Sequence, residues 1–256
     1  MPSEFQTVIA GVLVGFMVGM TGIGGGALMT PILVLLFGAP PMTAVGTDLL
    51  FAAITKMAGV GFHGRQGTID WQVCRRLAAG SLPTALLTGL SISYFGRDTL
   101  KVDSVIMHTL GLMLVVTAVG VVFKEKLHRI GRGFRIGDAE RFKALQGPLT
   151  VLAGMLLGVV VTLTSVGAGA LGTVMMLYLY PLRLTPVKLV GTDLAHAIPL
   201  ALVAGSGHFV AGHINYALLG VLLIGSIPGV LFGSWLSAKV SDRKSTRLNS
   251  SHVSQS

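Results

Sequence analysis

Residues 20–37 read MTGIGGGALMTPILVLLF, an apolar run in which four glycines fall between positions 22 and 26. Each glycine in a helix interior costs about 1 kcal/mol relative to alanine, so a helix through this run would be weakened at its centre. Such a cost is tolerated where the backbone has to stay open to a neighbour, because glycine has no side chain to cover it. The stretch therefore predicts a helix that is broken at residues 22–26.

The composition places this broken helix in a membrane. Of 256 residues, 52% are hydrophobic and 11% are charged, and the mean hydropathy is +0.78. Globular proteins carry about 25% charged residues. The apolar residues form continuous blocks at 8–21, 27–38, 44–62, 77–95, 104–123, 147–163, 170–180, 189–206 and 216–237. Several blocks reach the roughly 17–25 residues that cross a bilayer, so we expect an all-α polytopic membrane protein.

Basic residues are concentrated in one loop between apolar blocks. The net charge is +9, and seven lysines and arginines fall within residues 124–143. The positive-inside rule places such a loop on the cytoplasmic face, so the charge indicates lipid headgroups and not nucleic acid as the neighbour. We expect a first membrane repeat at 1–123, a basic cytoplasmic loop at 124–146 and a second membrane repeat at 147–241.

The last fifteen residues, DRKSTRLNSSHVSQS at 242–256, differ from the rest. They are polar, and residues 242–252 resemble a sequencing-adapter oligonucleotide read as codons. We expect a non-native tail that is disordered or unpacked, because it offers little apolar surface to offset the entropy of ordering. On this interpretation the second repeat is truncated and a last helix is missing.

The two halves of the chain repeat the same motifs. Residues 11–30 align with 154–173, and AVGTDLL at 44–50 aligns with LVGTDLA at 189–195. In nearly the same register, GSLP at 80–83 pairs with GSIP at 225–228. A register kept over several separate motifs indicates a duplication.

Loop charges suggest how the two copies are oriented. Basic residues follow the GTDL segment within 62–76 in the first copy, whereas the matching loop 207–215 has none. In the second copy Arg183 and Lys188 precede that segment instead. By the positive-inside rule the copies then face opposite sides, as in inverted-repeat transporters.

These motifs resemble the TauE/SafE sulfite-exporter family of anion permeases. The resemblance covers residues 8–240 and is carried by the glycine-rich segment, AVGTDL, HGRQGTIDW and GSLP. It implies a secondary transporter in the bacterial cytoplasmic (inner) membrane, multi-pass and without a cofactor, that moves sulfite, a sulfonate or a related small sulfur-containing oxyanion. Many members have a small hydroxyl residue where this chain has Asp48 and Asp193, which leaves the substrate and the coupling ion open.

The repeated break is the candidate substrate site. A half-helix that starts at a break presents uncapped N–H groups and a partial positive charge to an anion. We expect the anion to bind between the two breaks, at Thr21, Gly22, Gly24, Gly25, Gly26, Thr164, Ser165, Gly167 and Gly169. The alternatives are that the glycines only let helices pack closely and that the hydroxyls bond a carbonyl one turn back.

Asp48 and Asp193 occur once in each half, and an acid in the membrane costs about 2.5–3.5 kcal/mol. They carry coupling protons, support the breaks together with Thr47 and Thr192, or cap the helices that follow them. Lys56 lies about two turns after Asp48. It attracts the anion, or it extends to the headgroups.

Other function classes remain open on the sequence alone. Two membrane aspartates could form the acid–base pair of an intramembrane aspartyl hydrolase, and a non-transporting structural membrane partner is a third possibility. The chain lacks HExxH and GxSxG motifs, so we expect neither an enzyme nor a metal site. His63 and His208 are expected to be polar residues at the membrane interface. The sequence does not indicate an oligomeric state.

Overall fold

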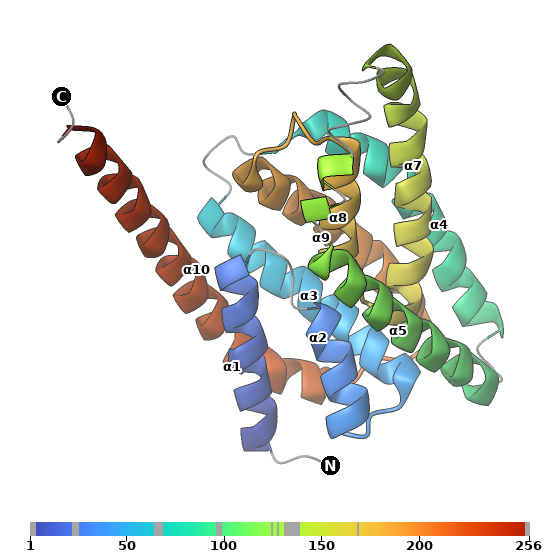
Figure 1. The fold of residues 1–256 in the computed structure, drawn as a ribbon. Coiled ribbons are helices and arrows are strands. Elements are labelled where there is room, and N and C mark those ends of the chain that lie inside the picture. Colours follow the sequence, from blue (N-terminus) through green and yellow to red (C-terminus); the bar gives the residue numbers. More distant parts are fainter. Residues whose placement is uncertain are drawn as a thin grey trace.

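The computed structural model describes residues 4–21, 26–63, 69–95, 99–123, 125–126, 128–130, 139–167 and 169–253, and these ranges contain helices and no strand. The prediction of an all-α chain is confirmed. Figure 1 shows the helices, which are α1 Glu4–Thr21, α2 Gly26–Pro31, η1 Ile32–Leu36 (a π-helix), α3 Pro41–His63, α4 Trp71–Phe95, α5 Thr99–Val122, α7 Ala139–Thr164, α8 Ala170–Leu179, α9 Pro186–Val210 and α10 Tyr216–Val253.

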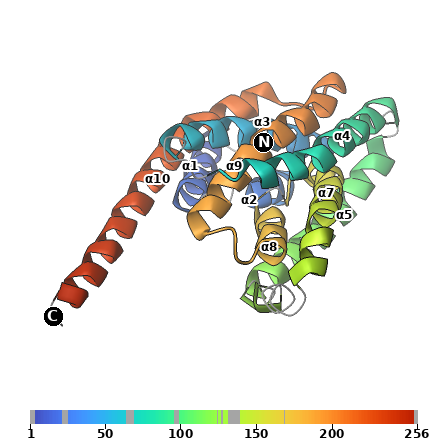
Figure 2. The ribbon, with the colours of Figure 1, turned by 90° about the horizontal axis from the view of Figure 1, so that it is seen from above.

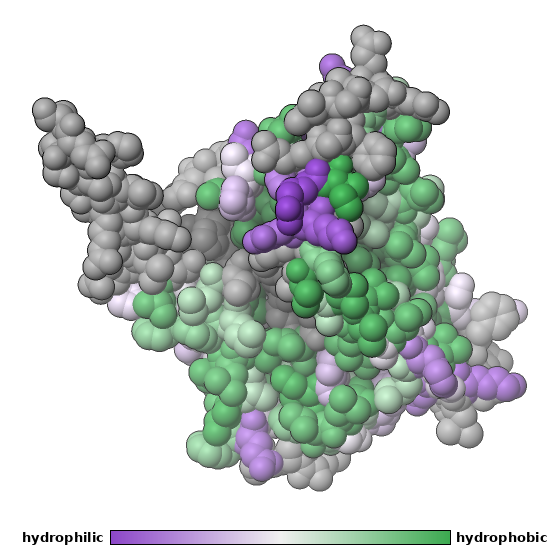
Figure 3. Space-filling view, viewed as in Figure 1, coloured by the Kyte–Doolittle hydropathy of each residue, from purple (hydrophilic) through white to green (hydrophobic). Residues whose placement is uncertain are grey.

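Four helical segments of the described chain are long and apolar enough to cross a membrane: Lys101–Gly120, Phe142–Thr164, Pro186–Val210 and Tyr216–Leu236. The outer surface fits a lipid environment, since Leu87, Val115 and Ile224 are each more than 60% exposed. Hydrophobic residues dominate the lower part of the face shown in Figure 3, and hydrophilic residues gather above them. An apolar surface of this extent is typical of a protein surrounded by lipid.

The two halves pack by exchanging equivalent helices. Helix α1 packs along α10, and α7, its counterpart in the second half, packs along α4, while α3 and α9 contact each other at the centre. In Figure 1, α1 runs upward from the N-terminus and α7 runs downward. An exchange of this kind is what a pseudo-twofold axis between the repeats produces. The direction of that axis relative to a membrane stays a prediction.

Glycines bring these paired helices together backbone to backbone. A Cβ on Gly15 would lie 2.3 Å from the carbonyl oxygen of Ser226, and one on Gly158 would lie 2.4 Å from that of Ser81. The two contacts are equivalent under the repeat. Only a residue without a side chain fits at such a distance, so these glycines have the packing role that small residues have in membrane helices.

Several predicted boundaries differ from the structure. Helix α7 begins at Ala139, inside the predicted loop 124–146, because the helix extends beyond its apolar part into polar residues. The predicted loops 62–76 and 207–215 are also shorter in the structure, because α4 already begins at Trp71 and α9 continues to Val210. Of the two alternatives for the polar tail, the structure has the unpacked one as far as Val253. Helix α10 continues through the tail, and Figures 1 and 2 show this end projecting away from the other helices.

Candidate functional site

The second predicted break is present between α7 and α8. Helix α7 ends at Thr164, and the chain then passes through Ser165 at φ 58° and Gly167 at φ 115° before α8 begins at Ala170. A left-handed conformation is rare for a residue other than glycine, so the strain at Ser165 marks a turn that the surrounding packing enforces. Gly169 is the N-cap of α8.

The predicted first break follows α1, which ends at Thr21, and precedes α2. Gly22, Gly24 and Gly25 lie outside the described residues, as does the side chain of Thr21, and Gly26 is the first residue of α2. Helix α2 passes directly into the π-helix η1, and neither this segment nor α8 exceeds about eleven residues. At 1.5 Å per residue each is about 15 Å long, roughly half of a hydrocarbon core of about 30 Å.

Asp48 ties the first half-helix to the centre of the molecule. Its Oδ2 accepts hydrogen bonds from the backbone N–H of Thr30 at 3.1 Å and from the Thr30 hydroxyl at 2.5 Å, and both residues are fully buried. The Ser165 hydroxyl of the opposite break is close enough to affect this carboxylate, although the pair does not reach hydrogen-bond geometry. Asp48 lies a full turn and more inside α3, which begins at Pro41, so the helix-capping interpretation is wrong for it.

Asp193 occupies the matching position in α9. The N-cap of α9 is Thr185, so the capping interpretation is wrong here too. The Oδ1 atom of Asp193 lies 3.2 Å from the position that a Cβ on Gly172 of α8 would occupy. Each aspartate therefore adjoins the half-helix of its own repeat. Neither Asp193 oxygen accepts a hydrogen bond from any residue that the structure describes.

Lys56 reaches the same region from α3. The residue is 3% exposed, and its Nζ lies 4.0 Å from Oδ2 of Asp193. Its charge also acts on Asp48. The interpretation that Lys56 extends to the headgroups is wrong, because the side chain turns inward to the only type of group that offsets a buried charge.

A second buried polar pair lies close to Lys56. Ser81 Oγ and His196 Nε2 are 2.8 Å apart, and neither residue is more than 1% exposed. The charge of Lys56 acts on the His196 ring as well. Sequence reasoning missed this pair, although Ser81 belongs to the repeated GSLP motif. In the other half Phe51 stands at the position that matches His196, so the repeat itself does not reveal the contact.

The hydroxyls of Thr47 and Thr192 join the two halves. The backbone N–H of Asn215, just before α10, donates to Thr47 Oγ1 at 3.0 Å. The backbone N–H of Asp70, just before α4, donates to Thr192 Oγ1 at 2.9 Å. These two bonds are equivalent under the repeat, so each hydroxyl fastens a loop of one half to a helix of the other.

Two more predicted residues have structural partners. The Thr164 hydroxyl donates to the Val160 carbonyl one turn back at 2.7 Å and accepts from the Val166 N–H, as the alternative interpretation states. His208, in the last turn of α9, is fully buried, and its Nε2 lies 2.9 Å from the Thr162 carbonyl, so this ring also has a structural partner. The side chain of His63 lies outside those that the structure describes.

The sequence of this chain matches one family model and several known relatives. The model described as "Sulfite exporter TauE/SafE" matches residues 7–250. The chain belongs to this family. It is 40% identical over 238 residues to "Probable membrane transporter protein YjnA" of Bacillus subtilis (strain 168), covering 92% of this chain and 91% of that protein.

Two further relatives are less similar. "Probable membrane transporter protein YdhB" of the same Bacillus strain is 28% identical over 227 residues, which cover 87% of this chain and 85% of that protein. A "Probable membrane transporter protein" of Methanocaldococcus jannaschii is 26% identical over 253 residues, which cover 94% and 87%. No solved structure matches the chain.

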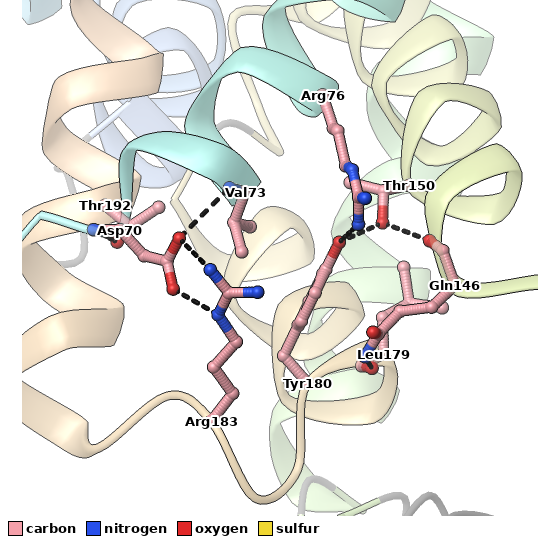
Figure 4. Close-up of polar contacts among 9 residues, drawn as sticks. All are labelled: Asp70, Val73, Arg76, Gln146, Thr150, Leu179, Tyr180, Arg183 and Thr192. Carbon is pink, nitrogen blue, oxygen red and sulfur yellow. Dashed lines mark hydrogen bonds and ion pairs between the residues drawn. The ribbon is translucent and has the colours of Figure 1, made fainter. Parts of the chain in front are cut away.

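In this TauE/SafE protein an ion pair joins the connection between α8 and α9 to the residue just before α4. Arg183, in the connection between α8 and α9, donates to Asp70 through Nε at 2.5 Å and through a terminal nitrogen at 2.8 Å (Figure 4). Burial opposes ionisation of Asp70, but the bonds from Arg183 and from the backbone N–H of Val73 outweigh it and hold the pKa of Asp70 below its usual value. At the matching place in the other half, Asn215 likewise accepts from the N–H of Leu218, but as an amide it carries no charge to pair with a cation.

Tyr180 fastens the same connection to α4 and α7. Its hydroxyl lies 2.8 Å from the Thr150 hydroxyl and accepts from Arg76 at 3.3 Å (Figure 4). Gln146 donates its side-chain amide to the Leu179 carbonyl at the end of α8. The C-terminal end of this half-helix is thereby fixed, whereas its N-terminal end faces the break.

A cavity of about 620 Å³ opens beside α8. Its walls are mainly apolar residues of α8 and α9, and the remaining lining includes Glu125, His128 and Arg129. Thr173, another lining residue, is the direct neighbour of Gly172, which adjoins Asp193. The cavity is therefore bounded by residues 125, 128 and 129 on one side and by the half-helix α8 on the other.

Proposed function

We propose that this membrane transporter of the TauE/SafE family is a secondary transporter for sulfite, a sulfonate or a related small sulfur oxyanion. The proposal places it in the bacterial cytoplasmic membrane, with the basic loop on the cytoplasmic side and the two repeats inverted. One observation carries it: Lys56 is buried 4.0 Å from Asp193 and its charge also acts on Asp48, and these two aspartates adjoin the half-helices α8 and α2.

The chemistry of this place suits an anion. A buried ammonium has to be paired, and a mobile oxyanion is a partner of the right charge. The N-terminal end of α8 adds a partial positive charge and N–H donors. The Ser165 hydroxyl, which is buried and without a hydrogen-bond partner among the described residues, supplies a further donor in the adjoining break. Together these groups offer positive potential without an isolated charge facing lipid.

The cavity beside α8 is the proposed entrance for the anion. Arg129 and His128 lie in its lining, where a basic residue raises the local concentration of an oxyanion. From there the path to the centre passes Thr173 and Gly172. The entrance is on the side of the basic loop, which the proposal assigns to the cytoplasm.

Proton coupling follows from the two acids. An ionised carboxylate close to the site would repel an oxyanion, so an aspartate has to be neutralised when the anion is present. Asp48 and Asp193 are the acids at this depth, and a proton is the smallest ion that neutralises them. The proposal is therefore a proton-coupled carrier.

Proteoliposomes with the purified full chain test the function. We expect them to accumulate radiolabelled sulfite or methanesulfonate when a pH gradient is imposed, and to accumulate far less without one. Equal accumulation by protein-free liposomes would refute the proposal.

Variants of one glycine test where the anion binds. Gly25→Val should abolish anion binding while the protein still inserts, because a β-branched side chain prevents an oxyanion from approaching the backbone N–H to about 2.9 Å. Gly25→Ala is the matched milder change, since the second repeat already has Ala168 at this position. Anion transport by Gly25→Val at the unmodified rate would show that these glycines serve only packing.

A further inference from the structure

The two aspartates at the centre are bound in different ways. Asp48 is held by both the backbone and the hydroxyl of Thr30. Asp193 accepts no hydrogen bond within the described structure, and its only charged neighbour of opposite sign is Lys56. Although the repeat matches the two residues, their surroundings give Asp48 a fixed structural partner and leave Asp193 dependent on a single cation.

The contact between Lys56 and Asp193 leaves hydrogen-bond donors unused on the lysine and acceptors unused on the aspartate. A direct charge-assisted hydrogen bond between an ammonium and a carboxylate is about 2.7–2.9 Å long. The Nζ–Oδ2 distance here is 4.0 Å, so charge alone links the two groups. A lysine ammonium has three donors. The three donors of Lys56 and the acceptors of Asp193 are thus available to a third group.

The remaining titratable groups around this pair do not replace Asp193. Asp48 of α3 is tied to Thr30, and His196 of α9 has its Nε2 bonded to Ser81 of α4. Helix α8 faces Asp193 with Gly172 and carries no charged residue, and α2 carries none either. The lysine has no counterpart in the second half, where Ala201 stands at the matching position. Among the described residues, Lys56 is therefore the cation that serves both aspartates.

Charge balance then limits what can occupy the site. With both aspartates ionised and Lys56 protonated, the cluster already carries a net negative charge, and an entering anion would be repelled by Asp193 and would compete with it for the same ammonium. Protonation of Asp193 forms one O–H bond, removes the carboxylate charge and leaves Lys56 without its partner. An oxyanion that replaces the carboxylate restores the pairing of the buried cation, as such a cation requires.

We infer that Asp193 and the transported anion are alternative partners of Lys56, so that the anion binds together with one proton on the Asp193 carboxylate. This inference rests on the proposed function and assigns the coupling to one of the two acids. When the anion leaves, the proton is released and the carboxylate pairs with Lys56 again. Asp48 keeps α2 in place throughout.

Equilibrium binding of radiolabelled methanesulfonate and of sulfite to the detergent-solubilised full chain tests this exchange. Methanesulfonate is the primary probe because its own charge does not change between acidic and alkaline buffers. The affinity of the unmodified protein should fall by about tenfold per pH unit once Asp193 ionises. Asp193→Asn, which imitates the protonated acid, should bind methanesulfonate with an affinity that does not change with pH. Proteoliposomes of this variant should exchange the anion but not accumulate it in a pH gradient.

Two further variants identify the cation. Lys56→Met should lower affinity at every pH by about tenfold to a hundredfold, the value of a lost charge-assisted hydrogen bond. Lys56→Arg should restore much of the affinity. If Lys56→Met alone fails to fold, the double variant Lys56→Met/Asp193→Asn removes both charges of the Lys56–Asp193 pair together and should fold without binding the anion.

Three results would overturn the inference. The first is an unchanged pH dependence in Asp193→Asn, and the second is a loss of pH dependence in Asp48→Asn instead; in both cases binding persists and the proposed function stands. The third is tight anion binding by the double variant, which would remove Lys56 from the site. Failure of the unmodified protein to bind either anion at any pH would overturn the proposed function, and the inference with it.

Discussion

The contact between α4 and α7 allows a quantitative test of how the halves are joined. A Cβ on Gly80 would lie 2.0 Å from the carbonyl oxygen of Val151. Real Cβ contacts begin at about 3 Å, so Gly80→Ala has to push the two helices apart by at least about 1 Å. A carbonyl cannot rotate away as a side chain can, because it belongs to the hydrogen-bonded backbone of α7.

The separation has a calculable cost. A radial gap of about 0.5–1 Å forfeits a quarter to a half of each dispersion contact, and overpacking of this kind costs about 1–3 kcal/mol. Alanine regains up to about 1 kcal/mol of helix propensity. We expect a net loss of about 1–2 kcal/mol, which lowers the melting temperature of a chain of this size by about 2–8 °C. Gly225→Ala should behave alike, since its Cβ would lie 2.2 Å from the Val8 carbonyl in the equivalent contact.

Gly111→Ala in α5 is the matched control, because a Cβ there would have no atom within 4 Å. It should melt at the same temperature as the unmodified protein or slightly above it. The measurement is thermal unfolding of the detergent-solubilised chain, followed by the loss of the monodisperse peak on size-exclusion chromatography. If Gly80→Ala melted with the unmodified protein, or if Gly111→Ala lost as much stability, the backbone-to-backbone packing of α4 on α7 would be refuted.

Three more predictions concern the central site and the ends. Thr30→Val should cost about 1–3 kcal/mol by removing a hydrogen bond to a buried carboxylate, whereas Thr173→Val, which has no such bond to Asp193, should cost less; equal melting temperatures would contradict the tether. Asp70→Asn keeps the helix cap but loses the ion pair, so it should cost about 1 kcal/mol or less at neutral pH, because Arg183 is 43% exposed. Since folding lowers the pKa of Asp70, the contribution of Asp70 to stability is present above about pH 4 and is lost as the pH falls through the lowered value. Acidification should therefore destabilise Asp70→Asn less than it destabilises the unmodified protein. An identical acid profile of the two proteins would argue against the ion pair. In a Cys74→Ala background, cysteines at Gln66 and at His213 should react with a membrane-impermeant maleimide from opposite sides of the membrane, and labelling from one side would refute the inverted repeat.

The sequence alone was sufficient for the class of fold and for the break in the second half. Apolar blocks longer than a bilayer crossing and helix-weakening glycines are properties of consecutive residues, so a local pattern reports them directly. The second break confirms this, since Ser165 and Gly167 adopt positive φ where the repeat places it. The duplication was also visible, because it is a comparison of one stretch of sequence with another.

The partners of the polar residues were decided only by the tertiary structure. Lys56 near one end of a helix has the same sequence pattern whether it extends to the headgroups or turns inward, and only the packing of α3 on α9 places it 4.0 Å from Asp193. Ser81 and His196 are separated by 115 residues along the chain, and Asn215 and Thr47 by 168. A hydropathy pattern reports which side chains avoid water, but it does not report which polar groups meet once the halves exchange helices. That pairing depends on long-range packing, and it is what distinguishes Asp193 from Asp48.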